Sequence, residues 1–308
     1  MIRFTLRRLL SLIPTLLGVS FIVFTLLYLT PGDAVTATMG ANAPKEAIEA
    51  TREALGLNDP FLTQYGRYLT GLVHGDLGTS YHTGRSVAET LGSMFPNTLK
   101  LAFFSLSIAV FFGISFGIVS AVKKYSILDH ITMVLGLVGL AMPIFWSGLL
   151  LILLFSVKWQ LLPSSGFTSF RHMILPAMAL GFQSTAVIMR QTRSSMLEVL
   201  NTDYIRTAKA KGLKEGRIIG IHALKNALIP VITTIGLQMG GLLGGSVLTE
   251  TIFSVPGIGR LMVESVKTRD YPIILGGVIY LSITYCVIAI IVDILYGFAD
   301  PRVRGKYQ

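Results

Sequence analysis

Residues 101–122 read LAFFSLSIAVFFGISFGIVSAV, a run of 22 residues without Asp, Glu, Lys, Arg or His. A helix of about 20 apolar residues is long enough to cross the ~30 Å hydrocarbon core of a bilayer. Lys100 and Lys123 bracket the run, so its polar ends are sharply defined. This stretch therefore predicts a membrane-spanning helix.

Further charge-free runs lie on both sides of this stretch. They are 17 to 27 residues long: Leu9–Leu29, Ile131–Val157, Met173–Met189, Asn226–Thr249 and Tyr271–Val292. Lipid offers no partners to unpaired backbone groups, so each run should be a helix. The 17-residue run can continue past Arg190 while that side chain snorkels to the interface. We expect an all-α integral membrane protein with six transmembrane helices. Buried core helices of a large soluble protein are the weaker alternative.

The composition agrees with a membrane protein and excludes other classes. Charged residues are 14% and apolar residues 52% of the 308 residues, whereas a soluble domain is about one quarter charged. The single cysteine, Cys286, excludes a disulfide framework, a Cys-rich zinc site and a Cys-ligated iron–sulfur centre. The net charge of +10 does not indicate a nucleic-acid partner, because the basic residues lie between apolar runs.

The positions of Lys and Arg predict the orientation in the membrane. Of the 26 basic residues, 16 fall in four segments that a six-span chain places on one side: 3–8, 123–124, 190–225 and 302–306. Such residues concentrate on the cytoplasmic side, so we expect both termini there. A cleaved signal peptide is the alternative at the N-terminus. However, the first apolar run of 21 residues is longer than an ordinary signal core, so we expect an uncleaved span.

Two polar stretches separate the apolar runs. Thr30–Pro96 is large enough for an external subdomain, and its residues Ala43–Gly56 and Pro60–Val73 are expected to form helices. The other stretch, residues 190–225, holds most of the cytoplasmic charge.

The fifth apolar run is rich in glycine. It contains Gly236, Gly240, Gly241, Gly244 and Gly245. Small residues let helices approach closely in lipid, so close packing is one interpretation. The other is that this helix lines a translocation path, where missing side chains leave room for a solute. Both interpretations remain open from the sequence.

Several kinds of site are absent from the sequence. We find no GxxxxGK[ST] phosphate loop, no HExxH, no GxSxG and no Cys/His spacing typical of a metal site. Ionisable residues lie only at the ends of the apolar runs, whereas a proton-coupled carrier needs them inside. A self-sufficient secondary carrier or channel and a membrane enzyme are therefore the weaker alternatives. A transporter of this kind would borrow its energy from another protein.

The second polar stretch contains a short helix with clear ends. Asn201, Thr202 and Asp203 are preferred N-cap residue types, and Gly212 suits the left-handed residue that follows a helix. A helix of about two and a half turns is too short to persist alone in water. It should therefore be held against another surface.

One face of this short helix is apolar. Helical spacing brings together Tyr204, Ile205, Ala208 and, past the end, Leu213, whereas Arg206 and Lys209 point elsewhere. We interpret the stripe as a face that enters a groove of a partner protein. The alternative is a basic helix that lies on anionic lipid. Residues 217–228 can continue as a helix to Pro230 and the glycine-rich run, so movement of the short helix would reach that run directly.

These residues resemble a known family. The sequence YIRTAKAKGL at 204–213, followed by HALKNALIP at 222–230, resembles the cytoplasmic coupling loop of ABC importer permeases. It is most similar to the first permease subunit of the dipeptide/oligopeptide/nickel group. The resemblance covers nearly the whole chain through ordered short motifs: TPGD at 30–33, LGLNDP at 55–60, GDLG at 75–78, FPNT at 95–98, ETIF at 250–253, PGIG at 256–259, RDYP at 269–272 and DPR at 300–302.

The coupling loop departs from the broad importer signature. That signature has Glu-Ala-Ala, then Gly four residues on, then Ile-x-Leu-Pro. Here Arg206-Thr207-Ala208 stands in for the triplet, Leu224 matches the Leu, and Lys225 replaces the Pro. The glutamate is missing, so no specific glutamate contact with an ATPase is carried over.

The resemblance implies a type I ABC importer permease fold, with residues 95–299 as a five-helix core. Residues 1–94 would add an N-terminal transmembrane helix and an external segment, and 300–308 a cytoplasmic tail. The chain would be a non-enzymatic half of a heterodimer in the plasma (inner) membrane. Two cytoplasmic ATPases would hold ATP and Mg, and an external solute-binding protein would deliver short peptides, or alternatively nickel chelates or glutathione. The implied ATPase-coupling residues are Asp203, Tyr204, Ile205, Arg206, Ala208, Lys211, Gly212 and Leu213.

Overall fold

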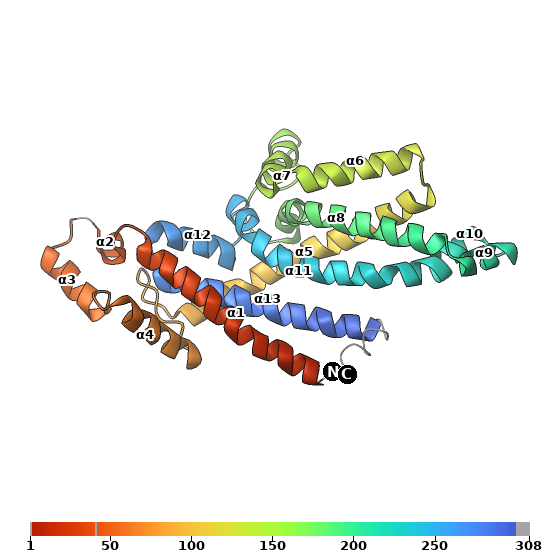
Figure 1. Cartoon of the computed structure of the whole chain (residues 1–308). Coiled ribbons are helices and arrows are strands. Elements are labelled where there is room, and N and C mark those ends of the chain that lie inside the picture. Colours follow the sequence, from red (N-terminus) through yellow and green to blue (C-terminus); the bar gives the residue numbers. More distant parts are fainter. Residues whose placement is uncertain (1, 41, 300–308) are drawn as a thin grey trace.

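The computed structural model describes residues 2–40 and 42–299, which form an elongated bundle of helices (Figure 1). Apart from a single bridge between Thr79 and Ser86, these residues contain helices, turns and irregular connections. The all-α prediction is therefore confirmed. Residues 300–308, the predicted cytoplasmic tail, lie outside the described residues.

The helices follow one another with short connections. The N-terminal part contains α1 (Ile2–Leu29), α2 (Ala34–Met39), α3 (Lys45–Ala54) and α4 (Phe61–Val73). The remainder contains α5 (Val87–Val122), α6 (Ile127–Ala141), α7 (Ile144–Leu151), the π-helix η1 (Ile152–Lys158), α8 (Phe170–Leu200), α9 (Asp203–Ala210), α10 (Glu215–Arg217), the π-helix η2 (Ile218–Ala223), α11 (Leu224–Ile252), α12 (Ile258–Thr268) and α13 (Tyr271–Ala299). Helix α8 continues past Arg190, as the sequence predicts.

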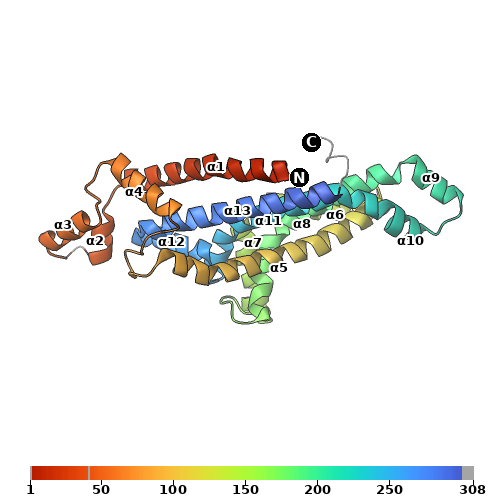
Figure 2. The same cartoon turned by 90° about the horizontal axis from the view of Figure 1, so that it is seen from below.

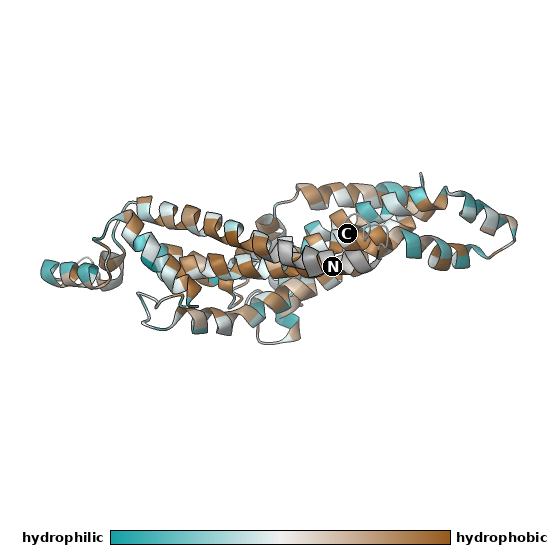
Figure 3. Ribbon diagram, turned by 60° about the horizontal axis from the view of Figure 1, so that its bottom comes forward, coloured by the Kyte–Doolittle hydropathy of each residue, from teal (hydrophilic) through white to brown (hydrophobic). Residues whose placement is uncertain are grey.

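Five helical stretches in the described residues are long and apolar enough to cross a membrane, and a bent pair makes a sixth candidate. They are Leu10–Leu29, Val87–Val122, Phe170–Leu200, Glu215–Ile252 and Tyr271–Val292, and the bent pair is Ile127–Ala141 with Ile144–Lys158. Figure 3 shows hydrophobic residues along the long helices, with hydrophilic residues gathered at α3 and around α9 and α10. The count of six spans is confirmed only if the bent pair is taken as one span.

The third apolar run does not form one continuous helix. It breaks between α6 and α7, where the chain turns by 110°, and Figure 2 shows α7 directed away from the bundle. Pro143 supplies no N–H and disfavours the helical conformation of the residue before it. Met142 is accordingly extended, with φ −79° and ψ 121°. The expectation of a single helix over Ile131–Val157 was therefore wrong.

Helices α5 and α8 form the centre of the bundle and run in the same direction. Gly113 lies against Ile188, and one turn later Gly117 lies against Thr192. A Cβ at either glycine would come within 3 Å of the facing helix, so these small residues permit the close approach of the two helices. Helix α11 packs beside them in the opposite direction, and Ala109, Ile188 and Val231 share one buried cluster.

The N-terminal part lies at the end of the bundle opposite α9 (Figure 1). Helix α1 runs along α13, α2 packs on α12, α3 packs on α2, and α4 packs on α1. The two helices predicted within Ala43–Gly56 and Pro60–Val73 are confirmed as α3 and α4. The sequence analysis did not predict α2 or α12, which are short and carry few apolar residues in a continuous run.

Candidate functional site

The predicted coupling helix is α9, at the tip of the molecule between α8 and α10 (Figures 1 and 2). Its C-terminus has the two hydrogen bonds of a Schellman motif. The Gly212 N–H donates to the Lys209 carbonyl at 3.0 Å, and the Leu213 N–H donates to the Ala208 carbonyl at 3.3 Å. Gly212 has φ +74°, which L residues with a side chain rarely adopt. The prediction that Gly212 ends this helix is confirmed.

The N-terminus of α9 follows Thr202, whose backbone is extended with φ −77° and ψ 155°. The Thr202 hydroxyl donates to the Val199 carbonyl at 2.6 Å, which fixes the corner between α8 and α9. Asp203 occupies the first turn, where a negative charge favours the helix dipole. Its ion pair with Arg206, at 3.5 Å, is open to solvent and contributes little stability.

The apolar stripe of α9 packs inside the chain itself. Ile205 is 0% and Ala208 8% exposed, and both belong to a cluster with Ala121 of α5, Met196 of α8 and Ala223 of η2. The interpretation that these two side chains enter a partner's groove was therefore wrong. Periodicity predicts which face is buried, and here the covering surface comes from α5, α8 and η2.

The surface of α9 that remains open is polar and basic. Arg206, Thr207, Lys209 and Lys211 are exposed, and Arg206 keeps 74% of its side chain accessible. Tyr204 is half exposed, and its hydroxyl accepts a hydrogen bond from Asn226 Nδ2 at 2.8 Å. A partner that binds α9 would therefore meet mainly basic and polar side chains, with the half-exposed Tyr204 beside them.

The buried cluster of Ala121, Met196, Ile218, Ala223 and Ala227, which we call the seat of α9, leads directly into α11. Ile218, Ala223 and Ala227 belong to the same buried cluster as Ile205 and Ala208. These residues lie in η2 and the first turns of α11, and α10, η2 and α11 continue as one helical stretch. Packed side chains thus connect α9 directly to the start of α11, which agrees with the sequence-based expectation of a direct connection.

A buried ion pair fixes α6 to α8 beside this seat. Asp129 accepts two hydrogen bonds from Arg193, from Nε at 2.8 Å and from Nη2 at 2.9 Å. It also accepts from the Ser120 hydroxyl at 2.5 Å and from the Tyr125 N–H at 3.0 Å. Only 5% of the Asp129 side chain is exposed. Asp129 was not predicted as a site residue, because its only signal in the sequence is an acid in the first turn of a helix after Ser126.

The five glycines of α11 divide into two groups. Gly236 lies against Val292, Gly240 against Tyr285 and Gly245 near Leu180. The surroundings of these three glycines agree with the interpretation that small residues allow close packing of helices. Around Gly241 and Gly244, a Cβ would meet nothing within 4 Å in the described part of the chain, and both are exposed. Only these two lie on an open face of α11.

At the opposite end, motifs far apart in sequence lie together. The Ser80 hydroxyl donates to Asp270 Oδ2, and the Tyr81 N–H donates to Asp270 Oδ1 at 3.1 Å. Asn97 Nδ2 donates to the Pro256 carbonyl at 2.9 Å, and the Thr98 hydroxyl accepts from the Ile258 N–H at 3.0 Å. These bonds attach the N-terminal segment and the start of α5 to both ends of α12.

Glu250, the residue that follows the fifth apolar run, is fully buried beside α12. Its Oε2 accepts a hydrogen bond from the Arg260 N–H at 3.0 Å, in the first turn of α12. A Cβ on Gly257 would overlap this carboxylate. The spacing of the ETIF and PGIG motifs thus lets a carboxylate bind the start of the next helix.

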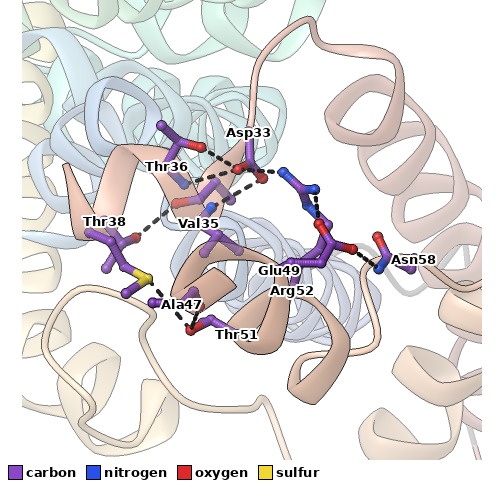
Figure 4. Close-up of polar contacts among 11 residues, drawn as sticks. Asp33, Val35, Thr36, Thr38, Ala47, Glu49, Thr51, Arg52 and Asn58 are labelled. Atoms are coloured by element: carbon purple, nitrogen blue, oxygen red, sulfur yellow. Dashed lines mark hydrogen bonds and ion pairs between the residues drawn. The ribbon is translucent and has the colours of Figure 1, made fainter. Parts of the chain in front are cut away.

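Asp33 organises the outer segment in the same way (Figure 4). Its carboxylate accepts the N–H groups of Val35, at 3.3 Å, and Thr36, at 3.0 Å, at the start of α2. Arg52 of α3 donates to it at 2.9 Å. Burial raises the pKa of Asp33, but the hydrogen bonds from Thr36 and Arg52 outweigh burial and hold that pKa below its usual value. The carboxylate is therefore ionised at neutral pH.

Within residues 2–40 and 42–299, no group of three or more His, Cys, Asp or Glu side chains is placed to hold a metal ion. The two candidate features are instead α9 with its seat and the open face of α11 at Gly241 and Gly244.

Comparison with family models gives two matches that together cover almost the whole chain. Residues 113–305 match "Binding-protein-dependent transport system inner membrane component". Residues 1–102 match "Binding-prot-dependent transport system membrane comp, N-term". The larger match includes α9, η2 and α11.

Full-length relatives are also found. The dipeptide transport system permease protein DppB of Escherichia coli (strain K12) is 43% identical, covering 99% of this chain and 100% of that protein. The DppB protein of Alkalihalophilus pseudofirmus is 42% identical with the same coverage. The glutathione transport system permease protein GsiC of Salmonella paratyphi A is 44% identical, again over 99% and 100%.

A solved structure has a similar fold. It is described as the crystal structure of an amino acid ABC transporter with histidines, and it matches with a TM-score of 0.51 at 16% identity. The match covers 70% of this chain and 94% of that one. At this identity the likeness concerns the fold alone.

Proposed function

The chain belongs to the family of binding-protein-dependent transport system inner membrane components, and we propose that it takes up short peptides as one permease subunit of an ATP-driven importer. It has the type I ABC importer permease fold. The observation that carries the substrate class is the 42–43% identity to dipeptide permeases over their full length. Glutathione, itself a tripeptide derivative, is the second candidate because a glutathione permease is 44% identical.

In this proposal the energy comes from partner subunits. Two cytoplasmic ATPases bind ATP and Mg, a second permease completes the path, and an external solute-binding protein delivers the peptide. The side of α9 that faces the ATPase carries the exposed residues Arg206 and Lys209, together with Lys211 at the C-terminal cap of the helix. The buried residues Ile205 and Ala208 carry its displacement into η2 and α11.

The orientation and the path follow the same proposal. The end of the molecule that carries α9 lies in the cytoplasm together with both termini, which the concentration of basic residues in segments 3–8, 123–124, 190–225 and 302–306 supports. Gly241 and Gly244 line the path, supported by the open space around them. Residues 95–299 form the permease core, and residues 1–94 brace it on the external side.

Uptake by the complete importer tests this function. The importer is reconstituted in proteoliposomes with its ATPases inside, its binding protein outside and ATP in the lumen. We expect ATP-dependent accumulation of a labelled dipeptide, competed by unlabelled dipeptide more strongly than by glutathione or a nickel–histidine chelate. If ATP-dependent uptake is the same with and without an excess of unlabelled dipeptide, the peptide assignment is refuted. Stronger competition by glutathione would favour the second candidate.

A further inference from the structure

A cavity of about 560 Å³ opens at the end of the molecule opposite α9. Its walls come from the end of α1, the turns 30–34, 54–57 and 76–81, the helix α4 and the start of α13. Pockets that hold small ligands commonly have volumes of about 300–1,000 Å³. The open glycine face of α11 contributes no residue to it, so this cavity is separate from the proposed path.

The cavity presents charges of both signs. Arg52 and Arg67 line it together with Asp33 and Asp76. Each arginine is held by an acid that is not part of the lining: Arg52 Nη1 pairs with Glu49 at 2.6 Å, and Arg67 pairs with Asp59. Figure 4 shows the Glu49–Arg52–Asp33 chain of contacts. A guanidinium has five N–H donors, so fixing one edge orients the group and leaves others for an anion.

Asp76 offers a site for a cation on the facing turn. One of its oxygens, Oδ1, accepts the Gly78 N–H at 2.8 Å, which fixes the carboxylate in a turn. The side chain is exposed on the cavity wall. A carboxylate held in this way can accept a hydrogen bond from an ammonium group through its other oxygen.

A buried hydroxyl in the lining lacks a partner. Tyr68 lines the cavity, and its hydroxyl is buried with no hydrogen-bond partner among the described residues. Burial, and to a lesser extent Tyr65, raises the pKa of this phenol, so it remains a donor at neutral pH. An orphaned buried donor is costly, so a hydrogen bond from this hydroxyl to an acceptor on a ligand would be favourable. Arg67, the preceding residue of α4, places a cation beside it.

We infer that this cavity is an external subsite for a short peptide with free termini, with the peptide carboxylate at Arg67 and Tyr68 and its ammonium group at Asp76. The inference rests on the proposed function, because a zwitterionic peptide is the solute that the importer would receive on this side. A phospholipid fits less well, because four charged side chains, two of each sign, share the same cavity, as the two charged ends of a free peptide require.

Photo-cross-linking in the assembled importer tests the subsite. The importer, with its partner subunits but without the binding protein, is placed in nanodiscs with a dipeptide that carries benzoylphenylalanine. We expect labelled residues within 24–34, 52–57, 64–81 and 271–275. Excess unlabelled dipeptide should compete, whereas the N-acetylated, C-amidated dipeptide should not.

Two tyrosines of α4 provide a matched comparison. Tyr68→Phe removes the orphaned hydroxyl, whereas Tyr65→Phe removes a hydroxyl that already bonds to Ser20 at 3.0 Å. We expect Tyr68→Phe and Asp76→Asn each to weaken labelling about tenfold, the effect of losing one hydrogen bond to a charged group. Tyr65→Phe should leave labelling unchanged.

Other outcomes overturn the inference. Labelling that is confined to α11, labelling that survives both Tyr68→Phe and Asp76→Asn, or equal competition by the capped dipeptide would each reject the subsite. Cross-linking of a diazirine phospholipid that the dipeptide cannot displace would assign the cavity to lipid. Peptide uptake is measured in parallel with the binding protein present. Uptake without labelling of the cavity rejects only the subsite, whereas absence of any peptide uptake rejects the proposed function.

Discussion

Arg193 binds Asp129 with two parallel hydrogen bonds, at 2.8 and 2.9 Å, one turn before Met196 enters the cluster that seats α9. This pair joins α6 to the same end of α8 that carries α9. Helix α9 is therefore connected to two helices: to α11 through η2, and to α6 through the part of α8 that holds Arg193. The second connection leads to the bent helix α7, which turns away from the bundle.

Arg193→Met should destabilise the permease strongly, because it leaves Asp129 buried without its cation. Breaking a buried ion pair costs about 3 kcal/mol or more. The double variant Asp129→Leu/Arg193→Met removes both charges and should recover most of that loss. Thermal unfolding in detergent measures this, with Arg206→Met as the control for an exposed pair, which should change stability by less than about 1 kcal/mol. Equal melting temperatures for Arg193→Met and Arg206→Met would contradict the structural role.

Gly212→Ala should cost about 1 kcal/mol, because φ is +74° at this position. A Cβ there would meet nothing within 4 Å in the described part of the chain, so backbone strain is isolated. Gly216→Ala is the matched control, since its Cβ meets equally open space and its helical backbone tolerates alanine. Gly212→Val should also lower uptake while membrane insertion stays normal. If the Gly212→Val importer transports at the wild-type rate, the left-handed end of α9 at Gly212 is not needed for coupling.

The two faces of α9 should respond differently to charge. Ala208→Arg forces a cation into the buried cluster and should lower the melting temperature of the permease alone. Lys209→Glu alters only an exposed side chain, so stability should hold while the ATPases co-purify in reduced amount. Co-purification of the assembled importer is the readout. If Lys209→Glu retains the ATPases fully and transports normally, the open face of α9 does not bind them, and the lipid-surface interpretation gains support.

Two glycines of α11, one turn apart, separate packing from transport. Gly240→Leu would push against the Tyr285 ring and should destabilise the protein by about 1–3 kcal/mol. Gly244→Leu meets no neighbour within 4 Å in the described residues, so stability should be retained while uptake falls several-fold. Melting temperature and proteoliposome uptake are compared for both. Normal uptake by a stable Gly244→Leu importer would remove Gly244 from the path.

The orientation predicts opposite labelling of two exposed residues. In a Cys286→Ser background, His82→Cys should react with an impermeant maleimide added to intact cells, and Lys214→Cys should react only after permeabilisation. His82 lies in the outer turn before α5, and Lys214 lies between α9 and α10. The reversed pattern would invert the topology and move the cavity to the cytoplasmic side.

The ends and the buried face of a helix could be predicted from the sequence, whereas the residues that pack against that face could not. Gly212 could be placed because a helix end depends on the conformation of a few neighbouring residues. The stripe of Ile205 and Ala208 was recognised as buried, but its cover comes from residues up to 87 positions away, such as Ala121. The bend at Pro143 lay inside an uncharged run, and a search for charge alone passes over a proline.

The contact between Ser80 and Asp270 joins residues 190 positions apart. At ribosomal speeds of about 5–20 residues per second, the hairpin that holds Ser80 waits roughly 10–40 s for its partner to be synthesised. Until α12 and α13 have been inserted, the early segment remains without its anchor. A ribosome that stalls before residue 270 would leave this segment as a recognisable mark of an unfinished chain.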